Sequence, residues 1–127
     1  MTSTVDRGRL AESLAASFLR LRGYTIRDRN VRLGPLEIDL VAELGDVLAV
    51  VEVKFRRRQA WGGALGAVNP AKVRHLETAA VRYLRWRGIR GRKIRFDVVL
   101  IEARAETDTL TLRHLPGAFP ATGRYFL

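Results

Sequence analysis

The sequence predicts an α/β domain with a central mixed β-sheet and helices on opposite faces. Two segments carry apolar residues at helical spacing, and the remaining apolar runs are short and rich in β-branched residues, as strands are. Their order is helix, strand, hairpin, helix, strand, strand, which favours a layered α/β fold. Because 127 residues suffice for one core and not for two, we expect a single domain over residues 1–119 and a C-terminal tail over residues 120–127.

The first helix is expected from Asp6 to Arg22, and Gly23 follows it as a stop signal. Its main apolar stripe, expected to face the core, comprises Leu10, Leu14, Phe18 and Leu21. Glu12 lies away from that stripe, beside a second apolar patch of Ala15, Ala16 and Leu19. From its position alone, Glu12 is expected to form a surface salt bridge.

An edge strand from Tyr24 to about Val31 and a turn at Gly34-Pro35 lead into the central feature of the chain, a β-hairpin. Its strands are Leu36–Leu44 and Val47–Phe55, and Gly45-Asp46 forms a two-residue turn.

This turn sets the register of the hairpin. Counting back from it places Asp39 directly opposite Glu52, and Glu37 opposite Lys54, with all four side chains on one face. Like charges at that separation destabilise a sheet unless a partner compensates them, and Mg²⁺ prefers such carboxylate oxygens. Ordinary cross-strand pairing at a solvent face is the alternative, above all for Glu37 with Lys54. Aspartate is rare inside apolar strands, so Asp39 fits that alternative less well.

Lysine is used sparingly in this chain. Of 23 Lys and Arg residues, only Lys54, Lys72 and Lys93 are lysines. A lysine two positions after Glu52 suits a role in proton transfer that an arginine could not fill, because the guanidinium stays protonated.

The segment after the hairpin is basic and glycine-rich, and it includes Arg56, Arg57, Arg58 and Trp61. We interpret it as a loop that contacts a phosphate chain; a solvated loop is the alternative. Asn69-Pro70 then caps a second helix, which runs to about Arg87. Its core stripe is expected to be Val73, Leu76, Ala80, Tyr83 and Leu84. Its candidate nucleic-acid-binding residues are Lys72, Arg74, Arg82 and Arg85.

Two further strands complete the expected sheet. Ile94–Ile101 reads as a central strand, in which Asp97 is expected to be structural and to cap a backbone group or pair with an arginine. Thr109–Leu115 reads as the last edge strand, with the remaining residues as a tail.

A formal charge of +10 and a pI near 11.3 point to a polyanionic partner, with nucleic acid as the leading candidate. The absence of cysteine excludes disulfides, a thiolate nucleophile and a cysteine-based zinc site. His75 and His114 are far apart in sequence, so any metal is expected to be bound by oxygen. With no apolar run long enough to span a bilayer and no apolar signal core, we expect a cytoplasmic protein.

Asp39 followed by Glu52-Val53-Lys54 resembles the D…(E)xK signature of the restriction-endonuclease-like, PD-(D/E)xK nuclease superfamily. Over residues 8–119 the chain resembles the YraN-like family, which is assigned to that superfamily near the archaeal Holliday junction resolvases. The segments that carry the likeness are 8–12, 19–24, 37–40, 51–54, 68–72 and 95–99. The chain departs from the family at Leu36, where glycine is common, and at Phe55, where threonine is common.

The resemblance implies a restriction-endonuclease-like core with the site on the hairpin and Mg²⁺ or Mn²⁺ as cofactor. It makes Asp39 and Glu52 metal ligands, Lys54 the residue that polarises the attacking water, and Glu12 an additional acid. The first function hypothesis is thus a metal-dependent endonuclease acting on duplex or branched DNA or on repair intermediates. A catalytically silent nucleic-acid-binding protein of the same fold is the alternative. RNA as a ligand and a homodimer are left open, the first by the charge and the second by the resemblance.

Overall fold

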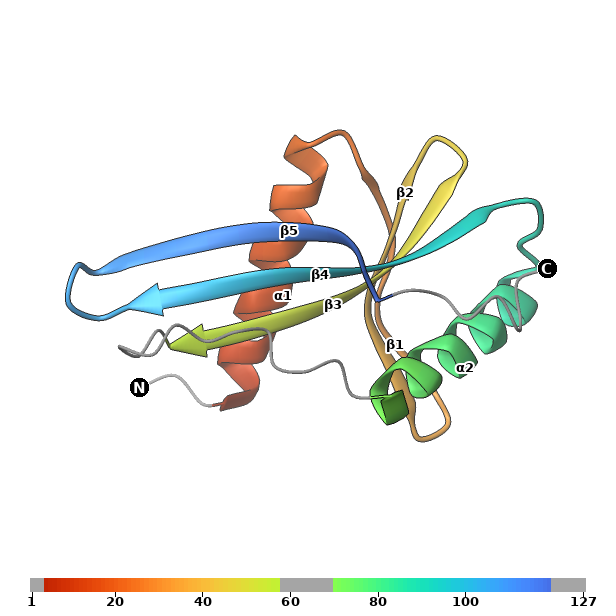
Figure 1. Ribbon diagram of the computed structural model, residues 1–127, viewed down its shortest axis with the longest axis horizontal. Coiled ribbons are helices and arrows are strands. Elements are labelled where there is room, and N and C mark those ends of the chain that lie inside the picture. The colour runs from red at the N-terminus through yellow and green to blue at the C-terminus, as the bar shows by residue number, and fades with distance from the viewer. Residues whose placement is uncertain (1–3, 58–69, 120–127) are drawn as a thin grey trace.

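The computed structural model describes residues 4–57 and 70–119, with side chains from residue 8 onward (Figure 1). The elements are α1 (Thr4–Leu21), β1 (Thr25–Leu33), β2 (Leu36–Leu44), β3 (Val47–Arg57), α2 (Pro70–Arg87), β4 (Lys93–Arg104) and β5 (Thr109–Phe119). The strands form one sheet in the order β1-β2-β3-β4-β5, in which only β3 and β4 are parallel. The α/β class, the mixed sheet and the element order are confirmed, and the fold is consistent with a restriction-endonuclease-like core.

The two helices cover opposite faces of the sheet. α2 packs through Val73, Leu76 and Tyr83 on a cluster that includes Phe96 and Val98 of β4. α1 packs on the other face against a second cluster, which includes Val51, Val99 and Ile101. The buried stripe predicted for α2 is confirmed, with Leu84 only partly buried at its margin.

The stripe predicted for α1 is wrong for Leu10 and Leu21, whereas Leu14 and Phe18 pack partly buried against the second cluster. Leu10 and Leu21 are 55% and 87% exposed, and the buried face comprises Ala11, Ala15, Ala16 and Leu19. Small side chains let the helix backbone approach the sheet closely, so the three alanines make the contact together with Leu19. Glu12 therefore follows directly after a buried residue, at the edge of the helix–sheet interface.

The last strand is longer than predicted. β5 passes through Pro116 and ends at Phe119, and its pairing with β4 shifts register between Phe96 and Val98. Proline is tolerated here because β5 is an edge strand. The shift turns the Gly117 N–H toward the Asp97 carboxylate, which it reaches at 3.0 Å.

The β1–β2 hairpin bends sharply in its middle and crosses the direction of β4 and β5 steeply (Figure 1). Asn30 has φ 52°, a left-handed conformation that asparagine tolerates better than most residues. The pairing of β1 with β2 is interrupted there, so that Asn30 and the opposite residue Asp39 do not form a pair. Ile38 and Leu40 consequently pack in different core clusters, although two residues of a straight strand would share a face. The strand therefore twists at Asp39.

Candidate metal and nucleic-acid site

The predicted hairpin register is confirmed from Leu44–Val47 to Leu40–Val51, where the pairing of β2 with β3 ends. Asp39 is the first residue beyond that point. Its Oδ2 accepts a hydrogen bond from the Val53 backbone N–H at 2.9 Å, so the side chain satisfies a donor that the departing strand no longer reaches. The bend of β2 thus fixes Asp39 at the place where the sheet splits.

The split also corrects the expected cross-strand pairs. The Asp39–Glu52 and Glu37–Lys54 rungs do not form, because β2 has already left β3. Glu37 lies opposite Arg32 of β1 instead.

Three carboxylates from two elements meet at the split. One oxygen each of Glu12, Glu37 and Asp39 lies within 4.8 Å of the others. Burial raises the pKa of Asp39 to about 6, and the neighbouring carboxylates act in the same direction, against the lowering effect of the Val53 hydrogen bond. This cluster therefore attracts a proton or a cation.

Glu52 faces a different partner. Its Oε1 forms an ion pair with Lys72 Nζ at 2.6 Å, and its side chain is only 12% exposed. Its other oxygen, Oε2, is buried and has no hydrogen-bond partner among the described residues, and the same holds for Glu12 Oε2. Buried carboxylate oxygens without partners are costly and indicate a ligand. The oxygens close enough to share one cation are those of Glu12, Glu37 and Asp39, an all-oxygen set of the kind that Mg²⁺ or Mn²⁺ prefers. Glu52 lies outside that group and lines the smaller hollow with Asp39.

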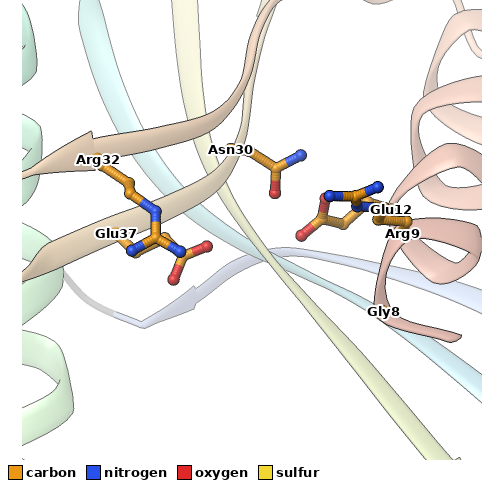
Figure 2. Close-up of a pocket in the computed structure, with 6 residues that line it drawn as sticks. All are labelled: Gly8, Arg9, Glu12, Asn30, Arg32 and Glu37. Atoms are coloured by element: carbon orange, nitrogen blue, oxygen red, sulfur yellow. The ribbon is translucent and has the colours of Figure 1, made fainter. Parts of the chain in front are cut away.

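Two hollows flank Asp39. The larger, about 360 Å³, lies between α1 and the β1–β2 hairpin and is lined by Gly8, Arg9, Glu12, Asn30, Arg32 and Glu37. Figure 2 shows the Glu12 carboxylate and the Asn30 amide facing this space from one side, with Arg32 and Glu37 on the other. The smaller, about 80 Å³, lies toward α2 and is lined by Glu37, Asp39, Val51, Glu52, Lys72 and Leu76. Glu37 lines both hollows. A single bound molecule at Glu37 is therefore placed to contact Glu12 in the larger hollow and Asp39 and Glu52 in the smaller one.

The remaining predicted residues surround the split at greater distance. Lys54 is partly buried on β3, and alternation along the strand places it on the same side as Glu52. It has no ion-pair partner within residues 8–57 and 70–119. The predicted nucleic-acid-binding arginines within those ranges are all exposed: Arg56, Arg57, Arg74, Arg82 and Arg85. Arg58 and Trp61 lie outside the described residues.

Sequence reasoning missed three residues that line the larger hollow: Arg9, Asn30 and Arg32. Nothing in hydrophobic periodicity distinguishes them from other polar surface residues. Two signals were available: Arg9 lies in segment 8–12, which carries the family likeness, and Asn30 lies inside an expected strand, where asparagine is unfavourable.

Asp97 is structural, as predicted. Arg95 donates two hydrogen bonds to it at 2.8 Å, and His114 Nε2 lies 2.8 Å from Oδ2. Although burial alone would raise the pKa of Asp97, the hydrogen bonds from Arg95, Gly117 and His114 outweigh it and lower the pKa.

A family model described as "Uncharacterised protein family UPF0102" matches residues 11–101, which include Glu12, Asp39, Glu52 and Lys54. The chain belongs to this family. It is 41% identical over 116 residues to a UPF0102 protein of Myxococcus xanthus, covering 91% of this chain and 90% of the relative. A UPF0102 protein of Renibacterium salmoninarum is 43% identical over 101 residues, covering 80% and 86%. One of Hahella chejuensis is 34% identical over 119 residues, covering 94% of both chains. The likeness to UPF0102 proteins thus extends over most of each chain, and the family resemblance expected from the sequence is confirmed.

Within the described residues, no helix of this UPF0102 chain is long and apolar enough to cross a membrane.

Proposed function

We propose that this UPF0102 protein is a metal-dependent nuclease that acts on DNA phosphodiesters, in particular on branched DNA or repair intermediates. The observation that carries the proposal is the carboxylate cluster at the split of the sheet, where Asp39 has a raised pKa and oxygens of Glu12 and Glu37 lie within 4.8 Å of it and of each other. The formal charge of +10 supports a polyanionic substrate.

The carboxylates hold the cation in this proposal. Asp39 is fixed by its bond to Val53 N–H and supplies a ligand from the centre, and the unpartnered oxygens of Glu12 and Glu52 supply ligands from either side. A bound Mg²⁺ or Mn²⁺ would polarise the scissile phosphate and lower the pKa of a bound water.

Two kinds of cationic side chain then act on the substrate. Lys54 orients the attacking water and stabilises the negative charge that develops on the phosphate, since its ammonium group is not occupied by another charge within the described residues. Arg9 and Arg32, which line the larger hollow, position the phosphates next to the cleaved bond.

The test is a cleavage assay on duplex, flap, single-stranded and four-way-junction DNA with Mg²⁺ or Mn²⁺. We expect Asp39→Asn, Glu52→Gln and Lys54→Met each to lower the cleavage rate at least about 100-fold, because each removes charge from the transition-state site. DNA affinity should stay within a few-fold, since phosphate contacts elsewhere dominate binding. Asp46→Asn, which removes an exposed carboxylate at the hairpin turn, is the matched control and should cleave normally.

Cleavage that survives in all three purified variants would disprove the assigned site. DNA binding without cleavage of any substrate by the wild-type protein would favour the catalytically silent nucleic-acid-binding alternative.

A further inference from the structure

The outer surface of α2 is basic along its whole length. The helix contains six basic residues and a single acid, Glu77, which is 1% exposed. The basic residues are Lys72, Arg74, His75, Arg82, Arg85 and Arg87. Lys72 at one end pairs with Glu52 and Arg87 at the other end pairs with Asp28. The helix itself adds no exposed carboxylate to this face, so the face as a whole complements a polyanion along about five turns of helix.

Trp86 is the exception on this charged surface. Its side chain is an exposed indole near the C-terminal end of the helix, with 61% of the residue accessible. The exposed large apolar residues of the described chain other than Trp86 all lie on other elements, so Trp86 is not part of an exposed apolar stripe along α2.

The Trp86 indole packs against a buried aromatic side chain, Tyr83. Its ring packs edge-to-face on Tyr83, with the centroids 6.0 Å apart and an interplanar angle of 70°. Tyr83 is buried, and its hydroxyl donates a hydrogen bond to Asp28 of β1 at 2.5 Å. The Arg87 guanidinium lies 5.3 Å from the Trp86 ring centroid. Trp86 is thus an exposed aromatic ring that packs on a buried side chain and lies next to cations. Such a ring is suited to stack on another flat group that has negative charge nearby.

A nucleobase on an unpaired strand meets this description, because its π-face is open and its phosphates are close. The bases of intact duplex DNA are stacked on one another and do not offer that face. The surface therefore favours single-stranded over double-stranded nucleic acid.

The distance along α2 from the carboxylate site to Trp86 determines how many nucleotides a bound strand must have to reach both. Lys72 at the start of α2 contacts Glu52 of β3. The later residues Arg82 and Tyr83 contact β1, so the helix runs alongside the β1–β2 hairpin. Fourteen residues separate Lys72 from Trp86, which corresponds to about 21 Å along the helix. At a rise of about 3.4 Å per stacked nucleotide, this distance spans roughly six nucleotides.

We propose that α2 carries an unpaired DNA strand away from the carboxylate site, with one base stacked on Trp86. The substrate class is then DNA with a single-stranded arm of about six nucleotides or more. The position of the site at one end of this track rests on the proposed function; the binding of the strand to α2 does not.

The test is a binding assay in EDTA, so that no cleavage interferes. In a Trp61→Phe protein, Trp86 is the only tryptophan, and its fluorescence reports directly on stacking. We expect quenching by a duplex with a flap of eight nucleotides and by oligo(dT), and little quenching by a blunt duplex. Affinity should rise with flap length up to about six nucleotides and then level off.

Substitution of Trp86 separates stacking from charge. Trp86→Ala should weaken flap binding roughly tenfold, as loss of one base–aromatic stack implies, and should leave blunt-duplex affinity within twofold. Trp86→Phe should retain most of the flap affinity. Leu21→Ala, at an exposed apolar position on α1, is the matched control and should bind as the wild type does.

Equal weakening of flap and duplex binding by Trp86→Ala would overturn the inference. A change from dimer to monomer on the same substitution, measured by light scattering, would also overturn it and assign Trp86 to an interface between two copies of the chain. If Trp86→Ala weakens only flap binding and the wild-type protein cleaves no substrate, the inference is supported and the nuclease proposal is rejected. Failure of the inference and failure of the proposed function can therefore be told apart.

Discussion

Asp39 and Asp97 are both aspartates inside apolar strands of one sheet, and their surroundings are opposite. Asp97 is fully buried and receives hydrogen bonds from Arg95 and the Gly117 N–H, with His114 at the same carboxylate. Asp39 accepts one backbone hydrogen bond, and the charges that act on its pKa are three other carboxylates. The hydrogen-bond donors around Asp97 stabilise its charged form, whereas the carboxylates around Asp39 destabilise its charged form.

The difference separates a charge that serves the fold from one that, in the proposed function, serves a ligand. The partners of Asp97 come from β4 and β5, so the network ties the end of the sheet together. The neighbours of Asp39 come from α1, β2 and β3, and they raise the free energy of the folded state unless a proton or a cation is present. A buried charge with incomplete partners is therefore the better indicator of function.

Replacement of Asp97 should give the largest change. Asp97→Ala leaves the Arg95 guanidinium without its carboxylate partner, and we expect it to lower the free energy of unfolding by about 3 kcal/mol or more. Asp39→Ala should cost far less, because it also removes repulsion. Urea denaturation of both variants measures the contrast, with Asp46→Ala as an exposed control expected within about 0.5 kcal/mol of wild type. A loss below 1 kcal/mol for Asp97→Ala would contradict the structural role.

The pH dependence of stability should distinguish the two aspartates next. The pKa of folded Asp39 is about 6, above its ordinary value of 3.8, so the folded state holds that proton more tightly than the unfolded state. Protonated Asp39 therefore stabilises the folded state below about pH 4, and this contribution is lost as the pH rises to about 6. A pKa difference of this size corresponds to about 3 kcal/mol in the free energy of unfolding.

Asp39→Asn should therefore gain stability relative to wild type between pH 4 and pH 6 and keep the gain above pH 6. Asp97 has the opposite sign, since its lowered pKa stabilises the fold above about pH 3.8 and that contribution is lost as pH falls further. Urea denaturation at a series of pH values in constant salt tests both. A difference between Asp39→Asn and wild type that does not vary with pH would show that Asp39 is not titrating in this range.

The smallest expected effect concerns Lys72, which neutralises Glu52 at 2.6 Å. In the proposed site Lys72 competes with a cation for this carboxylate, so Lys72→Gln should strengthen Mg²⁺ or Mn²⁺ binding. Because the lysine is about half exposed, the gain should not exceed about fivefold. The measurement is the rise in melting temperature with added metal at pH 7.5, in NaCl matched for ionic strength.

Arg74→Gln, which removes a neighbouring exposed charge from the same helix, should leave the metal response unchanged. Asp39→Asn should abolish most of it. If Lys72→Gln weakens the metal response, Lys72 supports the cation site and does not compete with it.

The parts of this fold that depend on local pattern could be predicted from the sequence. The Gly45-Asp46 turn and the alternation on either side of it determine the hairpin register, and α2 follows from its cap and apolar spacing. The buried face of α1 could not be obtained in this way, because Leu10 is larger and more hydrophobic than Ala11 and nevertheless lies outside. Which face of a helix is buried depends on how closely the sheet approaches, and the sequence of the helix does not contain that distance.

The sequence suggested some residues of the candidate site and did not suggest their arrangement. Asp39, Glu52 and Lys54 were found because charges in apolar strands are unusual. The split at Asp39 arises from a left-handed residue on the neighbouring strand, Asn30, and a single asparagine is too weak a signal to predict it. The meeting of Glu12 with Glu37 is a product of that bend.

The split also has a consequence for self-association. Beyond Val51, no described strand pairs with β3 on the side that β2 leaves, although β4 accompanies its other side as far as Arg57. An edge of this kind, with Phe55 partly exposed on it, is a template for pairing with a second chain and for aggregation. Lys54, Arg56 and Arg57 lie along it, and positive charge on an edge strand opposes the approach of a like edge. In the proposed function these cations meet DNA, so the same positive charge would serve both substrate binding and protection of the edge.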